Sequence, residues 1–255
     1  MSDWNTLHFF DDHTFYSEVA ADLKGEGILL RKYLFSDLGE RLTGSPVPDS
    51  FIDKISAFCK ELDHDFQTNL SLQKILRRTR KPEEQLEGFN AKKMQEADDY
   101  LNTCTQVIEY LNNILPGIVF SECASYNPHL ILGRKIFSAA VKAEPGSISA
   151  DLLDTIIYGK TDIHSMFNSG IKGWLTHEEL QLMWLDKANM CAADEHSQVY
   201  FHEFLSLVKT ALDKNLGLIS ITNVNENPLS GIAAPEWGSN LVNSFPGFQY
   251  IILRG

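Results

Sequence analysis

The sequence predicts a predominantly helical α+β protein, in which amphipathic helices pack around a small sheet formed by N- and C-terminal strands. Short apolar segments suited to strands lie near both ends, and the sequence between them repeats apolar residues at helical spacing. Hydrophobic residues make up 44% of the 255 residues and charged residues 22%, as in ordinary globular domains. We therefore expect a single globular domain over residues 1–255.

The N-terminal part predicts a strand, a helix and a second strand. Residues 6–10 suit a strand, and Asp11 and Asp12 follow as turn or N-cap residues. A short amphipathic helix should then run to Gly25, because apolar residues recur there every four positions. Residues 28–35, apolar apart from two cations, predict the second strand. The apolar positions of the expected helix are Phe15, Val19 and Leu23.

The middle of the chain predicts long helices. Two of them cover residues 51–66 and 70–80, and a third carries apolar residues at alternating spacings of three and four from Met94 to Leu115. We expect the third helix to end at Pro116–Gly117, where proline and glycine follow the stripe. The stripe predicts packing within a helix bundle, and it could instead form the seam of a homodimer.

The second half carries clear helix signals. Ser149 can cap a helix that runs to Tyr158. Thr176 and Glu179 have the spacing of a capping box, which predicts the start of another helix. Apolar residues between positions 201 and 212 predict a further helix, which should end near the next glycine.

The last strands are expected over residues 216–224 and 248–253. Between them lies a long segment rich in glycine, proline, asparagine and serine, which contains Trp237. A loop of this length often has a function, and the alternative is a surface segment whose tryptophan is packed into the core. Two earlier segments are further candidate strands, 118–120 and 129–141, of which the second could also be a helix.

Charge and composition limit the classes of partner. The formal net charge of −12 disfavours binding to nucleic acid across a broad surface, because the phosphate backbone is also negative. No apolar run approaches the roughly 18 residues of a membrane span, so we expect no membrane contact. The N-terminus lacks the features of a secretory signal, and the four cysteines form no close pair. These observations predict a soluble, cytoplasmic protein.

The motifs that would identify an enzyme or a metal site are incomplete. Residues 159–161 read Gly-Lys-Thr, but a phosphate-binding loop needs a glycine where Asp154 stands. Neither His-Glu pair is followed by the second histidine of a zinc site. Of two segments that resemble EF-hand loops, 168–179 places Lys172 at a ligand position and 192–203 places an alanine there. We therefore expect no calcium or other metal and no cofactor, and we assign no catalytic residues.

The remaining interpretation is a non-catalytic protein-binding module, such as a cytosolic inhibitor or immunity protein that neutralises a basic effector or toxin domain. Acidic residues beside aromatic ones would steer and anchor a basic protein. One alternative is an enzyme with an uncommon site of histidine and carboxylate near His13, His196 or His202. The other is a helical scaffold or oligomer built on the 94–115 stripe. The expected partner-binding residues are Asp11, Asp12, Asp194, Glu195, Tyr200 and Trp237.

Overall fold

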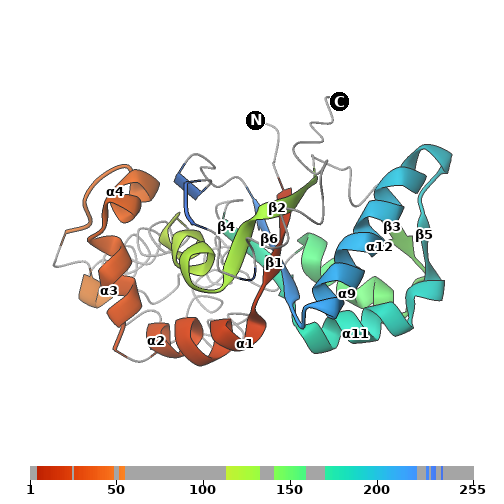
Figure 1. Ribbon diagram of the computed structural model, residues 1–255, viewed down its shortest axis with the longest axis horizontal. Helices are drawn as coiled ribbons and strands as arrows, with labels where there is room; N and C mark the ends of the chain where they lie inside the picture. The colour runs from red at the N-terminus through yellow and green to blue at the C-terminus, as the bar shows by residue number, and fades with distance from the viewer. Residues whose placement is uncertain are drawn as a thin grey trace, which may run out of the picture.

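The computed structural model shows a mixed α+β fold built on a four-stranded antiparallel sheet (Figure 1). β1 (Asn5–Phe10) lies between β2 (Ala124–Leu132) and β6 (Gly217–Thr222), and β4 (Gly170–Leu175) pairs with the other edge of β6. The expectation that N- and C-terminal strands share one sheet is confirmed.

The structure describes residues 5–24, 26–48, 52–54, 113–132, 141–158, 170–222, 228–229, 231–233 and 237. Outside them lie most of the helix expected over 51–66, the helix over 70–80, the stripe from 94 to 112 and the strand over 248–253.

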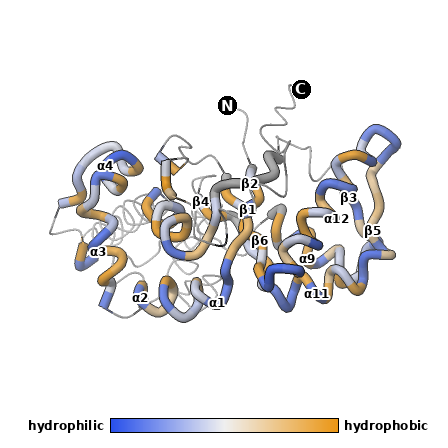
Figure 2. Tube along the Cα trace, viewed as in Figure 1, coloured by the Kyte–Doolittle hydropathy of each residue, from blue (hydrophilic) through white to orange (hydrophobic). Residues whose placement is uncertain are grey.

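The alternation of side chains along the strands divides the interior into two cores. Leu7 and Phe9 of β1 belong to one core, and Phe10 belongs to the other. On β6, Leu218 lies opposite Phe9 and joins the first core, whereas Ile219 joins the second. Figure 2 shows these hydrophobic strand segments at the centre of the molecule. One sheet therefore supports helices on both of its faces.

Helices from the N-terminal part, together with the helix over residues 113–122, cover the core that contains Phe10 (Figure 1). We call this face of the sheet, with its helices, the α3 side. The amphipathic helix expected after β1 is confirmed, since Phe15, Val19 and Leu23 are all buried. Its middle part is wound as a π-helix. The elements are α1 (Asp12–Thr14), η1 (Phe15–Ala20), α2 (Ala21–Lys24), α3 (Ile28–Leu34) and α4 (Asp37–Thr43).

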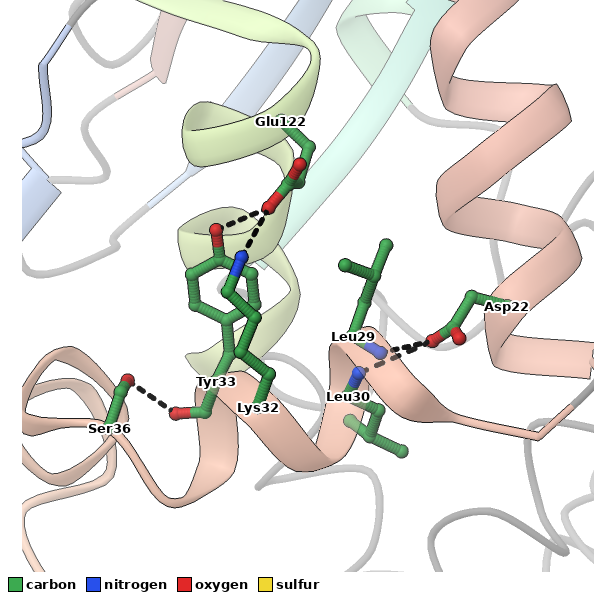
Figure 3. Close-up of polar contacts among 7 residues, drawn as sticks. All are labelled: Asp22, Leu29, Leu30, Lys32, Tyr33, Ser36 and Glu122. Atoms are coloured by element: carbon green, nitrogen blue, oxygen red, sulfur yellow. Dashed lines mark hydrogen bonds and ion pairs between the residues drawn. The ribbon is translucent and has the colours of Figure 1, made fainter.

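The strand expected over residues 28–35 is wrong, because this segment forms α3. The Asp22 carboxylate accepts hydrogen bonds from the backbone N–H groups of Ile28, Leu29 and Leu30, at 2.7, 2.9 and 3.3 Å. Figure 3 shows the contacts with Leu29 and Leu30. The first N–H groups of a helix have no partner within it, so an acceptor from outside stabilises the helix start. This carboxylate favours a helix that the apolar pattern alone does not predict.

The described helix over residues 113–122 runs through Pro116–Gly117, so the helix end expected there is wrong, and so is the candidate strand over 118–120. Gly117 has another role in the structure. A Cβ atom at this position would lie 2.5 Å from a methyl group of Leu42, so any other residue here would force the Leu42 side chain of α4 to shift. The second candidate segment is a strand where it is described, as part of β2.

The core of Leu7 and Phe9 is covered by helices from the second half of the chain, and we call this the α12 side (Figure 1). The predicted capping box is confirmed: the Glu179 N–H donates to Thr176 Oγ1 at 3.2 Å, and the Thr176 N–H donates to Glu179 Oε2 at 2.8 Å. The last predicted helix is confirmed as well. The elements are β3 (Val141–Ala143), α9 (Ile148–Tyr158), α11 (His177–Leu185), η2 (Lys187–Asn189), β5 (Met190–Ala192), η3 (Glu195–Ser197) and α12 (Gln198–Asp213), with β3 and β5 paired.

The start of α9 differs from the expected one by two residues. Ser147 supplies the cap, because its Oγ accepts the N–H of Ala150 at 3.1 Å. Ser149, the expected cap, is buried in the first turn and donates its own N–H to the Asp186 carboxylate at 2.8 Å. This hydrogen bond joins the start of α9 to the residue that follows α11.

Candidate functional site

The first pair of predicted partner-binding residues serves the structure of the chain itself. Asp11 caps α1, with its carboxylate accepting the N–H of Thr14 at 3.0 Å and the Thr14 hydroxyl at 2.7 Å. Asp12 accepts the N–H of His177 at 3.1 Å, which joins α1 to the start of α11. Partial burial raises the pKa of Asp12, and the bond from His177 opposes this effect. Both carboxylates are half-buried and accept hydrogen bonds from within the chain.

The second pair lies at the start of α12. Asp194 is exposed and caps η3 by accepting the N–H and the hydroxyl of Ser197 at 2.9 and 2.8 Å. These two hydrogen bonds lower the pKa of Asp194, so it is ionised at neutral pH. Glu195 is exposed beside it, and Tyr200, in the first turn of α12, is half-buried. This end of α12 therefore offers two carboxylates and one aromatic ring.

The structure does not bring the two acidic pairs together. α12 has 16 residues, which corresponds to a length of about 24 Å. Its C-terminal end leads to Gly217, which pairs with Phe10 next to Asp11, whereas Asp194 precedes its N-terminal end. Trp237 contributes to neither pair, because it is half-buried and packs against the core of the α12 side.

The histidines of the enzyme alternative are also separated. His13, His196 and His202 are exposed, and the length of α12 lies between His13 and His196. No motif in the sequence singles out His8, which is fully buried in β1, with its Nε2 2.6 Å from Thr6 Oγ1 and its ring in a T-shaped contact with that of Phe120. Within the described residues, no cluster of three acidic, histidine or cysteine side chains could hold a metal ion. No helix described here is long and apolar enough to cross a membrane.

One face of α11 exposes leucines beside a carboxylate. Its solvent-facing residues are Glu178, Gln181, Leu182 and Leu185, whose spacing of three, four and seven places them on one side of the helix. Leu185 is 81% exposed and Leu182 is 48% exposed, so neither contributes fully to the core. Sequence reasoning missed this face, although the same spacing could be read from residue 178 onward.

The start of α9 adds to this face. The Asp186 carboxylate holds the N–H of Ser149, and the Asp186 carbonyl accepts the Ser149 hydroxyl at 3.3 Å. These bonds bring Ile148, which is exposed, close to the end of α11, and Asp151 is exposed one turn further along α9. We refer to the following five residues as the α11 surface: Ile148, Asp151, Glu178, Leu182 and Leu185.

The surroundings of the α11 surface are acidic. Residues 141–158 and 177–203 together contain nine carboxylates and two lysines. One of these lysines, Lys187, holds its Nζ 4.2 Å above the ring of Trp184 in a cation–π contact. The pKa of Asp186 is lowered, chiefly by the N–H of Ser149, so this carboxylate keeps its charge. The surface therefore combines apolar side chains with a negative potential.

A polar cluster on the α3 side has a different character (Figure 3). Glu122 accepts the Tyr33 hydroxyl at 2.5 Å and the Lys32 ammonium at 3.3 Å on the same oxygen. Burial, followed by the bond to Glu122, raises the pKa of Tyr33, so this group stays neutral and donates its proton. These two bonds to the Glu122 oxygen join α3 to the helix over residues 113–122.

Comparison of the chain with models of protein families, with curated proteins and with solved structures found no match.

Proposed function

We propose that the chain is a non-catalytic protein-binding module that uses an acidic, partly apolar surface to bind a basic protein, as an inhibitor or immunity protein would. The observation that carries this proposal is the α11 surface, where Leu182, Leu185 and Ile148 face solvent among carboxylates. Exposed apolar side chains that lie next to one another and form a patch are typical of interaction sites, whereas single ones occur on any protein surface. A cytoplasmic location and a toxin-like target remain part of the same proposal.

The two kinds of residue would have different roles in binding. Asp151 and Glu178 would raise the rate of encounter with a basic partner, because opposite charges attract beyond contact distance. The exposed side chains of Leu182 and Leu185 would enter apolar pockets of the partner and slow its dissociation. Asp194 and Glu195 would extend the same negative field to the start of α12, where Tyr200 would offer an aromatic contact.

The test begins with affinity capture by the purified chain, followed by identification of the captured protein and measurement of its binding kinetics. The double reversal D151K/E178K should lower the association rate by several-fold, and so should a rise from 50 to 500 mM salt, on the order of the effects expected for steered association. The variant L182A/L185A should mainly raise the dissociation rate. E195K should have a smaller effect on association.

The matched control is E18K/E40K, which makes the same change in net charge on the α3 side, where both carboxylates are exposed. It should slow association much less than D151K/E178K. If both double reversals slow association equally, only the total charge matters and the α11 surface is not the site. An association rate that responds to neither salt nor charge reversal would remove the basis of the proposal.

A further inference from the structure

α3 carries an exposed face whose spacing matches that of α11 but whose charge is opposite. Its solvent-facing residues are Ile28, Arg31, Lys32 and Phe35, again separated by three, four and seven positions. Ile28 is 62% exposed and Phe35 is 60% exposed. We refer to these four residues as the α3 face. In a chain of net charge −12, a helix face with two cations and no carboxylate of its own stands out.

Ion pairs hold both cations in place without covering them. Lys32 is bonded to Glu122, yet its side chain is 61% exposed while that of Glu122 is 22% exposed. Arg31 pairs with Asp53 at 2.8 Å and keeps 44% of its side chain exposed. Fixed side chains lose less conformational freedom when they bind. Each cation of the α3 face thus has one intramolecular carboxylate partner, Asp53 or Glu122, and remains exposed enough to meet a second one.

The α3 face and the α11 surface cannot meet within one chain, because α3 and α11 lie at opposite ends of the molecule (Figure 1). We infer that the α3 face of one copy binds the α11 surface of a second copy, head to tail. Arg31 and Lys32 would lie near Glu178 and Asp151, and the exposed apolar residues of both surfaces would cover one another. This inference goes beyond the proposed function, although a second copy and a basic partner would compete for the α11 surface.

The size of the two surfaces sets the expected strength of the contact. Each helix face extends over about two turns, or roughly 11 Å, so the interface falls at the small end of specific interfaces. The association should therefore be weak and should depend on protein concentration and salt. Because the two surfaces differ, each copy keeps one surface free, which permits a ring or an open chain.

Complementation of two variants tests the inference. I28S/F35S alters only the α3 face, and L182S/L185S alters only the α11 surface. All four side chains are exposed, and circular dichroism checks that each variant keeps its fold.

In sedimentation velocity over a hundredfold range of concentration, the wild type should show a rising average mass. Each variant alone should associate at least tenfold more weakly. An equimolar mixture should recover association, but only to a one-to-one dimer, since one intact surface remains on each variant. The control V199S, at another exposed apolar residue, should behave like the wild type.

Three sedimentation results would overturn the inference: a wild type that stays monomeric, a mixture that does not associate, or a single variant that associates like the wild type. Binding of the α3 face to vesicles of phosphatidylserine and phosphatidylcholine, lost in I28S/F35S, would also overturn it in favour of a membrane. A monomeric wild type would leave the proposed function standing, because that proposal is judged by the association rate of a different protein.

Discussion

The two faces of the sheet differ in how their helices are held. On the α3 side, the N-cap of α3 is Gly27, which has no side chain, so Asp22 supplies the acceptor from six to eight residues away, and Glu122 lies across from the middle of the helix. On the α12 side, α11 begins with a capping box formed by residues within one turn of each other, to which the more distant Asp12 adds an acceptor for the N–H of His177. Distant contacts make the position of a helix depend on the folded structure, whereas a local cap acts as soon as the helix forms.

The same difference extends to the exposed surfaces. The α3 face presents cations whose counter-charges come from other elements, Asp53 and Glu122. The α11 surface presents carboxylates in an acidic part of the chain. A single chain thus carries two helix faces of matching spacing and opposite charge, each next to a different core.

Removing a large buried ring should have the largest effect on either side. F15A on the α3 side and F204A on the α12 side should each lower the free energy of unfolding by about 3–5 kcal/mol, because both rings are fully buried. Urea unfolding followed by circular dichroism measures the change. Since β1 contributes to both cores, each variant should shift one common transition. Two separate transitions in F204A would show that the sides fold independently and would contradict a single domain.

The next largest effect is expected at the Glu122 cluster. E122A should lower the free energy of unfolding by about 1.5–3 kcal/mol, because the half-buried Tyr33 hydroxyl loses a charged acceptor. K32M should cost only about 0–1 kcal/mol, because the ion pair is exposed on the lysine side. Y33F provides the matched partner for a double-mutant cycle with E122A. A larger effect of K32M than of Y33F would mean that charge, and not the tyrosine bond, holds α3.

Loss of a cap should have a moderate and local effect. D22A and T176A should each lower the free energy of unfolding by about 1 kcal/mol, the usual value of a helix cap. Hydrogen exchange should show faster exchange in α3 for D22A and in α11 for T176A. E26A, at an exposed residue close to α3, is the control for D22A. If D22A leaves exchange in α3 unchanged, this helix does not depend on the Asp22 carboxylate.

The elements that the sequence predicted correctly are those with local signals. The capping box at Thr176 and the apolar spacing of α12 identify helices without knowledge of the rest of the fold. β1 and β6 are short apolar segments next to turn residues, and their pairing follows from the expected single sheet. These signals lie within a few residues of the structure that they specify.

The errors fall where side chains outside an element decide its structure. Residues 28–35 are apolar enough for a strand, and only the carboxylate of Asp22 and the contact with Glu122 explain a helix there. The pair Pro116–Gly117 reads as a helix end, although the glycine is explained by the packing of Leu42 against it. The N-cap expected at Asp11 or Asp12 is confirmed at Asp11, whereas the bond from the His177 N–H to Asp12 depends on a distant part of the chain. Their acidity predicted a binding role that remains a prediction.

Asp12 offers the smallest and most specific test. Partial burial raises its pKa above the value of about 3.9 in an unfolded chain, so the folded protein binds this proton more tightly than the unfolded chain. The resulting contribution to stability is complete below about pH 3.9 and is lost as the pH rises through the raised pKa of the folded state. At neutral pH the charged carboxylate therefore has a cost, which its bond from His177 offsets in part.

The variant D12N should separate the charge of this residue from its hydrogen bond. The amide oxygen can still accept the His177 N–H, but no charge has to be partly buried. At pH 7, D12N should match or exceed the wild type in free energy of unfolding by up to about 0.5 kcal/mol, the usual range of a surface substitution. This advantage should disappear towards pH 3, where the wild-type carboxyl is protonated as well. D12A, which also removes the acceptor, should lower stability by about 1 kcal/mol throughout. If D12N is as unstable as D12A at pH 7, the charge itself is needed to join α1 to α11.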